Sequence, residues 1–281
     1  MNTENYLKVK RLIENADAII IGAGAGLSTA AGINYGKKGF AEKYPELVKK
    51  YGFTDMYSSS FYPFKTEEER WSYWAKHIED LCIGRGATAT YQKLYQLVQE
   101  KNYFVITTNV DQQFEKSGFL QEKIFEVQGS LTKIQCARGC HNKLYDDTCM
   151  VREMLKEDED GKVPTSLVPY CPKCGGTMEV NLRKDNFFVE DEHWHNQERK
   201  YEQFIRDNQE KKLLFLEFGV GFNTPGIIRY PFEELTSQFP YSNLVRVNQD
   251  FADISKKIHD KAYGFSENIN VFLDKISSKS L

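Results

Sequence analysis

The chain has 281 residues, of which 37 are lysine or arginine and 40 are aspartate or glutamate, so the formal net charge is −3. This length predicts one large domain, or a large domain with a small module. The balanced charge provides no basic surface for nucleic acid, and no apolar run approaches the ~18 residues that cross a bilayer. We therefore expect a soluble, cytoplasmic protein without nucleic-acid or membrane partners.

The first elements surround a glycine-rich turn. Residues 4–15 predict a charged amphipathic helix rather than a signal peptide, and the apolar residues 18–21 predict a buried strand. Gly22, Gly24 and Gly26 follow, and a helix is expected from Leu27. Strand, glycine turn and helix N-terminus together favour a phosphate-binding loop, because glycine lets the backbone approach an anion. A tight turn without a ligand is the alternative.

The details of this turn argue against an ordinary dehydrogenase. If G-x-G-x-x-G is counted from Gly22, the third glycine position holds Leu27, and if it is counted from Gly24, that position holds Thr29. The loop therefore favours a dinucleotide, but not the hydride-transfer version of the fold.

Residues 35–84 lack the strand-helix rhythm of the segments on either side and predict a helical insertion. Thr66, followed by three glutamates, is typical of a helix start. Trp71 and Trp74 recur at helical spacing, which indicates a packing face, and we expect His77 to be structural.

Polar side chains follow several predicted strands at the point where each strand ends. The strand over 103–107 leads into Thr108, Asn109 and Asp111, and a short strand over 124–127 ends at Gln128. Strands over 213–218 and 244–247 end at a second glycine turn and at an asparagine (Gly219, Val220, Gly221; Asn248). Ligand sites of α/β folds form at this edge of the sheet. Helix caps and turn formers are the alternative for any one of these residues, but explain the whole set less well.

Two close cysteine pairs lie about 30 residues apart, Cys136 with Cys140 and Cys171 with Cys174. Such pairs predict a zinc ribbon, in which four thiolates close a structural site without an open position for catalysis. Free or redox-active thiols are the alternative. His141 is a conceivable substitute ligand.

The last third of the chain is expected to return to the main domain. A long polar helix should run to about Glu210, and His193 and His195 near its start fit a solvated helix end better than a metal or acid–base site. The tail from Asp250 to Leu281 is predicted to be largely helical.

The ordered motifs GAGAGLSTAAGI, TTNVD, EVQGS, C-x3-C with C-x2-C, FGVG and RVN resemble the sirtuin family across nearly the whole chain. The resemblance implies that the chain is an NAD-dependent enzyme. Its fold would be α/β, with a Rossmann-like parallel sheet domain and an inserted smaller module of zinc ribbon and helices. The domains would be residues 1–34, 85–131 and 182–281 for NAD binding, 35–84 for the helical insertion and 132–181 for zinc.

The resemblance also implies the site residues. NAD would be held by residues of the first loop and its continuation, of three strand ends and of the second glycine turn (Gly24, Ala25, Gly26, Ser28, Gly32, Tyr35; Thr108, Asn109, Asp111, Gln128, Asn248; Gly219, Val220, Gly221). Asn109, Asp111 and Gln128 would be the catalytic set.

Several positions depart from the usual family pattern. Thr108 stands where glutamine is usual, Gln128 replaces the catalytic histidine, and residues 183–190 lack the Phe-Gly of the substrate-clamping segment. These departures resemble the microbial class M, whose members resemble mono-ADP-ribosyltransferases. In that class the modified protein is typically a lipoylated carrier like the glycine-cleavage H protein, with a macrodomain hydrolase and a lipoate ligase as functional partners.

The chemistry supports the same prediction. Deacylation needs a base to deprotonate a ribose hydroxyl, and a glutamine cannot accept that proton, whereas direct transfer to a nucleophilic side chain avoids the step. We therefore predict protein ADP-ribosyl transfer. A deacylase and a non-enzymatic NAD sensor are the alternatives.

Overall fold

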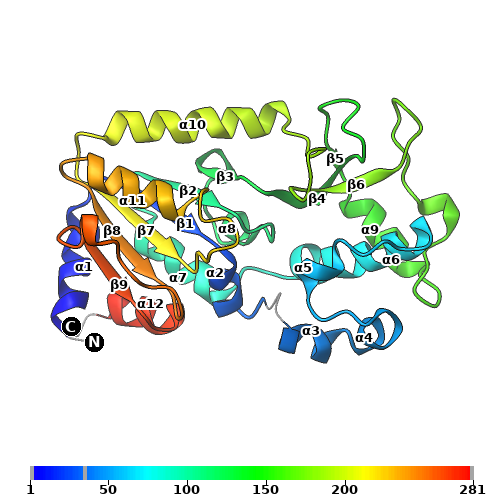
Figure 1. The fold of residues 1–281 in the computed structure, drawn as a ribbon, viewed down its shortest axis with the longest axis horizontal. Coiled ribbons are helices and arrows are strands. Elements are labelled where there is room, and N and C mark those ends of the chain that lie inside the picture. The colour runs from blue at the N-terminus through cyan, green and yellow to red at the C-terminus, as the bar shows by residue number, and fades with distance from the viewer. Residues whose placement is uncertain (1–2, 34–36, 279–281) are drawn as a thin grey trace. The chain divides into compact units, whose positions relative to one another are not determined.

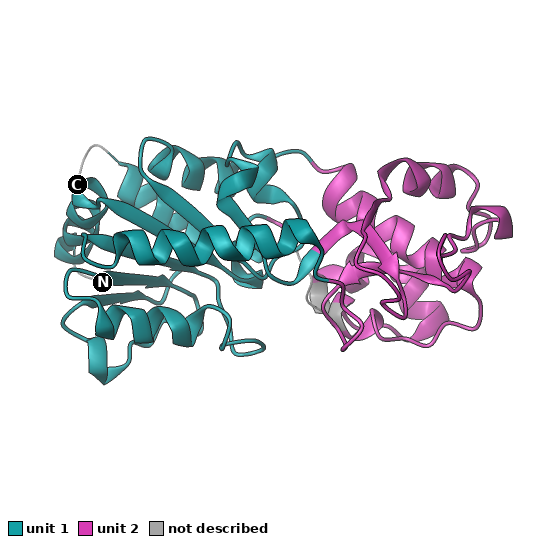
Figure 2. Ribbon diagram, turned by 90° about the horizontal axis from the view of Figure 1, so that it is seen from above, with its two compact units in different colours: residues 1–31, 86–129, 190–281 teal, residues 32–85, 130–189 magenta. Residues whose placement is uncertain are grey.

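The computed structural model describes residues 3–33 and 37–278, which form two compact units. The first unit contains residues 1–31, 86–129 and 190–281, and the second contains residues 32–85 and 130–189, as Figure 2 shows by colour. The later segment of the second unit, residues 130–189, is longer than the zinc module expected at 132–181. The chain returns to the first unit only at Glu190.

The first unit is built on a six-stranded parallel sheet with the order β3-β2-β1-β7-β8-β9 (Figure 1). Its strands are β1 (Ala18–Ala23), β2 (Tyr103–Thr107), β3 (Ile124–Glu126), β7 (Leu213–Phe218), β8 (Asn243–Val247) and β9 (Ala262–Phe265). Every residue of β1, β2 and β7 is buried, as their continuous apolar runs predict. The strand order reverses between β1 and β7, so their carboxyl ends form the crevice where folds of this class bind ligands.

Helices cover both faces of this sheet. They are α1 (Thr3–Asn15), α2 (Ala25–Ala30), α7 (Ala89–Val98), α8 (Gln113–Lys116), α10 (Glu192–Asn208), α11 (Arg229–Gln238) and α12 (Ile269–Ser277), with short 3₁₀ turns η2 (Gln121–Lys123) and η4 (Lys256–Ile258). Ile19 and Ile21 join the core with α1, α7 and α12, whereas Ile20 joins the core with α10 and α11. Alternate strand residues therefore supply two separate cores.

The second unit combines helices with a small sheet of order β5-β4-β6. Its elements are α3 (Lys37–Lys43), α4 (Pro45–Tyr51), α5 (Met56–Ser59), α6 (Glu67–Ile78), the π-helix η1 (Glu79–Ile83), β4 (Gly129–Cys136), β5 (Tyr145–Asp146), α9 (Thr148–Lys156), η3 (Thr165–Leu167) and β6 (Met178–Leu182). Thr66 accepts a hydrogen bond from the Glu69 amide and caps α6. Trp71 and Trp74 are buried, so the predicted packing face is confirmed.

The tail differs from the sequence prediction. Residues 262–265 form the edge strand β9, so the expectation of a largely helical tail is wrong, although α12 agrees with it. The strand has four residues and a central glycine, Gly264, at which a Cβ would lie 2.2 Å from the Ala252 carbonyl oxygen. Propensity is a weak guide to so short an edge strand. Among the described residues, no helix has the length and apolarity to span a membrane.

Candidate functional site

Two glycine turns contact each other at the carboxyl ends of β1 and β7. The Gly26 amide donates a hydrogen bond of 2.9 Å to the Gly219 carbonyl, and the Gly24 amide donates one of 3.0 Å to the Phe218 carbonyl. A Cβ on Gly26 would lie 2.6 Å from the Gly219 Cα, and one on Gly219 would lie 2.3 Å from the Leu27 nitrogen. Gly219 also has a φ of 63°. These glycines are therefore required for the contact between the turns.

Gly22 has a different role. A Cβ there would lie 2.5 Å from side-chain atoms of Ile228 and Phe232, so glycine lets α11 pack closely on β1. The pattern that resembles a dinucleotide-binding motif thus combines one helix-packing glycine with two that allow close backbone approach.

Asn109 is fixed by the glycine turn and by a tyrosine. Its Nδ2 donates to the Gly24 carbonyl at 3.0 Å and to the Tyr91 hydroxyl at 3.1 Å, and its side chain is buried. The residue before it, Thr108, donates its amide to the Ala23 carbonyl at 3.0 Å. The end of β2 is therefore tied directly to the end of β1.

Asp111 joins the same group of side chains. Its Oδ2 accepts from the Ser28 hydroxyl at 2.5 Å, and its Oδ1 accepts from the Gln113 amide at 3.1 Å. Asp111 is 1% exposed and Ser28 is fully buried. The structure thus brings together Gly24, Ser28, Asn109 and Asp111, which the sequence proposed separately.

Asn248 connects the loops that follow β7 and β8. Its Nδ2 donates to the Val220 carbonyl at 2.9 Å, and its Oδ1 accepts from the amides of Asp250 and Phe251, each at 3.1 Å. Gly219 donates its amide to the Val247 carbonyl at 3.0 Å. These bonds hold the second glycine turn and the loop after β8 in a fixed relation.

A cavity of about 230 Å³ lies among these loops. It is lined by residues of both glycine turns and of the loops after β8 and β9 (Gly26, Thr29, Ala30, Gly219, Asn248, Gln249, Asp250, Glu267, Asn268, Ile269). Sequence reasoning identified Gly26, Gly219 and Asn248 but missed the residues after β9. If β9 had been predicted as a parallel strand, the residues after it could have been placed at this edge of the sheet.

Gln128 is half-buried in the turn between β3 and β4. The preceding Val127 donates its amide to the carbonyl of Thr107, the last residue of β2, at 3.0 Å. Gln128 therefore lies just beyond the paired ends of β2 and β3. The Val127 carbonyl accepts from the indole nitrogen of Trp194 at 3.3 Å. The first turn of α10 is therefore anchored at this strand end.

His193 and His195 flank Trp194 at the start of α10. The Nδ1 of His195 lies 3.4 Å from Glu198 Oε2, and its Nε2 lies 3.9 Å from Glu190 Oε2. The prediction that His77 is structural is confirmed, since His77 is buried against the rings of Tyr44 and Tyr73.

The remaining predicted cofactor residues are less informative. Val220 is buried and Ala25 is exposed in the first turn of α2, and a Cβ on Gly221 would meet nothing within 4 Å. Gly32 has a φ of 79° and belongs to the second unit. Tyr35 lies outside the described residues.

A buried ionic cluster supports the loop after β8. Arg246 donates to both carboxylate oxygens of Glu217, at 2.7 and 2.9 Å, and also to Glu233 at 2.7 Å. Arg229 lies 3.7 Å from Glu217 and donates to the Phe251 carbonyl at 2.9 Å. Burial disfavours the charged form of Arg246, but the hydrogen bonds to Glu217 outweigh it and raise its pKa. The paired charges therefore anchor the loop that carries Asp250.

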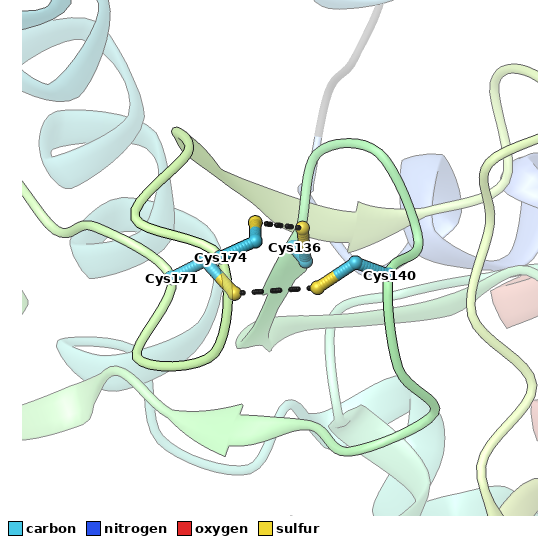
Figure 3. A group of neighbouring side chains, drawn as sticks. All are labelled: Cys136, Cys140, Cys171 and Cys174. Carbon is cyan, nitrogen blue, oxygen red and sulfur yellow. Dashed lines mark hydrogen bonds between the residues drawn. The ribbon is translucent and has the colours of Figure 1, made fainter.

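The four predicted metal ligands converge in the second unit. Figure 3 shows Cys136 beside Cys174 and Cys140 beside Cys171, with Sγ–Sγ distances of 3.7 and 3.6 Å. All four sulfurs lie within 4.8 Å of one another. Tetrahedral zinc with Zn–S bonds of ~2.3 Å requires sulfurs about 3.8 Å apart. The cluster therefore fits a structural zinc ion.

The surroundings of Cys174 favour its thiolate form. The pKa of Cys174 is lowered to about 6, chiefly by the Gly176 backbone amide and then by Arg138. His141 has its Nδ1 3.1 Å from the Cys140 sulfur and its Nε2 3.0 Å from the Tyr145 hydroxyl. The other two cysteines lie outside the cluster: Cys82 is buried and Cys149 is exposed.

Comparison with known proteins agrees with this geometry. The Sir2 family model matches residues 24–214. The chain belongs to the Sir2 family. It is similar to a protein ADP-ribosyltransferase of Staphylococcus aureus, with 32% identity over 266 residues that cover 94% of this chain and 84% of the relative.

Other relatives of this Sir2-family chain carry different names. A probable bifunctional ADP-ribose hydrolase/ADP-ribosyltransferase of Fusarium oxysporum is 31% identical over 79% of this chain, which spans 38% of that relative. An NAD-dependent protein deacetylase of Clostridium perfringens is 27% identical over 62% of this chain and 64% of the relative.

Solved structures show the same fold. One reported for the structural basis of sirtuin substrate affinity has a TM-score of 0.60 at 21% identity and covers both chains completely. A Sir2 homologue in complex with NAD has a TM-score of 0.58 at 17% identity, covering 96% of this chain and 91% of that structure. The predicted fold class, an α/β Rossmann-like sheet with an inserted module, is therefore confirmed.

Proposed function

We propose that this chain is an NAD-dependent protein mono-ADP-ribosyltransferase of the sirtuin type. The observation that carries the proposal is the composition of the sheet edge. Asn109 and Asp111 are tied to the first glycine turn, while Gln128 occupies the neighbouring strand end. The name of the Staphylococcus aureus relative supports the same activity.

The glycine turns and the cavity suit the adenosine and phosphate portions of NAD. Gly24, Gly26 and Gly219 lack the Cβ atoms that would obstruct backbone approach, and the cavity lined by Gly26, Gly219 and Asn248 would take the adenosine side. We further propose contacts from Ala25, Ser28, Gly32, Tyr35, Thr108, Val220 and Gly221.

Asn109 and Asp111 would act at the nicotinamide ribose. Breaking the bond between ribose C1′ and the nicotinamide nitrogen sends the electron pair to nicotinamide and leaves positive charge on the ribose. Asn109 can accept from a ribose hydroxyl, and the Asp111 carboxylate lowers the energy of the developing cation through its negative charge. Holding these groups in place before the reaction avoids the cost of ordering them during it.

Gln128 separates transfer from deacylation. Deacylation requires a base that removes a proton from a ribose hydroxyl, and an amide has no basic group that can do so near neutral pH. In transfer, a side chain of the acceptor protein forms the new bond to C1′, and its proton passes to Asp111 or to a base of the acceptor. Gln128 can still hydrogen-bond the ribose.

We also propose which protein receives the ADP-ribose. The resemblance to class M favours a lipoylated carrier similar to the glycine-cleavage H protein, working with a macrodomain hydrolase and a lipoate ligase in the cytoplasm.

One observation favours a deacylase as the second candidate. The indole of Trp194 donates to the carbonyl of Val127, which is the residue before Gln128. His195 is the residue after Trp194. In the second candidate, His195 replaces the missing base. An NAD sensor without turnover is the third alternative.

Two variants test the transferase directly. We expect wild-type protein to release nicotinamide from NAD and to leave an acetyl-lysine peptide intact, and Asn109→Ala to lose nicotinamide release on the order of 100-fold. Gln128→His should gain deacylation of the peptide. Peptide turnover by wild-type protein that His195→Asn abolishes would establish the deacylase instead. Tight NAD binding without nicotinamide release would establish the sensor.

A further inference from the structure

Four polar side chains of the first unit form one continuous chain of hydrogen bonds. Asn109 Nδ2 lies 3.1 Å from the Tyr91 hydroxyl, which lies 3.0 Å from Ser28 Oγ, which in turn lies 2.5 Å from Asp111 Oδ2. Ser28 and Tyr91 come from α2 and α7, while Asn109 and Asp111 follow β2. Tyr91 is the one member that the proposed mechanism does not use.

The direction of each hydrogen bond follows from the number of donors. Asn109 Nδ2 is a donor only, so the Tyr91 oxygen accepts from it. Asp111 accepts the hydroxyl proton of Ser28, which uses the one proton that Ser28 can donate. The bond between Tyr91 and Ser28 therefore has Tyr91 as its donor. The chain runs from the amide of Asn109 through two hydroxyls to the carboxylate.

This direction determines how Asn109 presents its amide. One of its two N–H bonds goes to the Gly24 carbonyl and the other to Tyr91. Its Oδ1 is then the atom that can accept from a ligand hydroxyl. Without the Tyr91 oxygen, Asn109 Nδ2 loses one of its two acceptors and keeps only the Gly24 carbonyl. The orientation of the amide is then less firmly fixed.

Tyr91 itself has little freedom. Its side chain is fully buried, and its ring packs edge-on against Phe114 with the centroids 4.9 Å apart. Burial and the nearby Asp111 raise the pKa of the phenol, so it stays neutral and keeps its proton for Ser28. A neutral hydroxyl both accepts and donates here, which phenylalanine cannot do.

We propose that Tyr91 is a positioning residue for nicotinamide release, which holds the Asn109 amide and the Ser28 hydroxyl in their reactive orientation. The inference rests on the proposed function, since it assigns Tyr91 to the site where that reaction would occur. Tyr91 acts through Asn109 and Ser28 and makes no contact with the reacting atoms in this account.

The test compares two identical deletions on one helix. Tyr91→Phe removes the hydroxyl and keeps the ring. Tyr95→Phe does the same one turn later, where the ring packs against Phe119 outside the chain of hydrogen bonds. We expect Tyr91→Phe to lower kcat for nicotinamide release by on the order of 10- to 100-fold, with the KM for NAD changed less than about threefold. Tyr95→Phe should match the wild type.

A double-mutant cycle separates positioning from general stabilisation. Ser28→Ala and Tyr91→Phe interrupt the same chain, so the loss of kcat in the double variant should be smaller than the product of the two single losses. Multiplicative losses would mean that the two hydroxyls act independently. Melting temperatures of all variants, measured by circular dichroism, establish that each is folded under the assay conditions.

The outcomes distinguish the two proposals. Equal kcat for Tyr91→Phe and Tyr95→Phe, or a KM increase with unchanged kcat, would overturn the role of Tyr91. Nicotinamide release without ADP-ribose on any protein would overturn the transferase and leave the role of Tyr91 standing, because the step belongs to both sirtuin reactions. A wild-type protein that releases no nicotinamide would overturn both.

Discussion

The amide of Gly26 donates a 2.9 Å hydrogen bond to the carbonyl of Gly219, which joins two turns nearly 200 residues apart in sequence. Their backbones approach so closely that neither position has room for a Cβ. The two turns therefore form one structure, and the cavity beside them depends on both.

Alanine at Gly219 should disrupt this structure. The new Cβ would lie 2.3 Å from the Leu27 nitrogen, and the positive φ disfavours any side chain. We expect Gly219→Ala to reduce the free energy of unfolding by about 2–4 kcal/mol, measured by urea denaturation. Gly226→Ala, where a Cβ meets nothing within 4 Å, is the control and should remain within about 0.5 kcal/mol of wild type. Equal stability of the two variants would contradict the close approach.

The ionic cluster under β7 and β8 leads to a second prediction. Arg246→Met removes both hydrogen bonds to the fully buried Glu217 carboxylate, and Arg229, 3.7 Å away, does not replace them. We expect the free energy of unfolding to fall by about 3–5 kcal/mol, because the buried carboxylate loses both hydrogen bonds from Arg246 and keeps only the longer contact with Arg229. Adding Glu217→Gln should restore part of the loss. If urea denaturation finds Arg246→Met within 1 kcal/mol of wild type, the cluster does not contribute as described.

Asp147 gives the second unit a pH dependence. Its carboxyl is buried with both oxygens unpaired in the described structure, and burial, aided by Asp146, raises its pKa from 3.8 to about 7. Because the folded state holds the proton more tightly than the unfolded state, this group costs no stability below about pH 4. The cost grows as the pH rises to about 7 and is then constant.

Asp147→Asn should therefore melt at a higher temperature than wild type at pH 8, with the difference shrinking toward pH 5. Asp146 is the control, since the Thr148 amide and Lys133 outweigh its burial and lower its pKa. Asp146→Asn should be less stable than wild type near neutral pH and lose that difference on acidification. A difference for Asp147→Asn that stays constant between pH 5 and pH 8 would show that the carboxyl does not titrate in this range.

The cysteine cluster predicts one zinc ion per chain. Cys171→Ser should remove it and unfold the second unit, because the binding energy of a structural zinc contributes directly to folding. Cys149→Ser, which changes an exposed cysteine outside the cluster, should retain both the metal and the fold. Elemental analysis and circular dichroism measure the two effects. Full zinc occupancy in Cys171→Ser would exclude the four-cysteine site.

The sequence predicted those parts of the fold that have a strong local signal. The buried strands are continuous apolar runs, and the residues that follow them could be placed at one edge because parallel strands end together. The cysteine pairs have the spacing of a zinc ribbon, and the four sulfurs do converge.

Other features depend on contacts that no local pattern encodes. Tyr91 lies in α7 with Leu94 and Val98, so its hydroxyl cannot be distinguished from that of an ordinary core tyrosine. The anchoring of Trp194 at Val127 joins segments 67 residues apart and brings the start of α10 to the end of β3. Glu217 lies within an apolar strand and becomes meaningful only once Arg246 is seen beside it.

The most direct test of the account follows ADP-ribose itself. The purified protein is incubated with NAD labelled in its adenylate portion, a lysate of its source cells and an acetyl-lysine peptide, with Asn109→Ala protein in parallel. We expect label on a discrete protein band with wild-type protein, an intact peptide, and no label with the variant. Deacetylated peptide without labelled protein would mean that another group performs the role of the missing base, and would contradict the transferase.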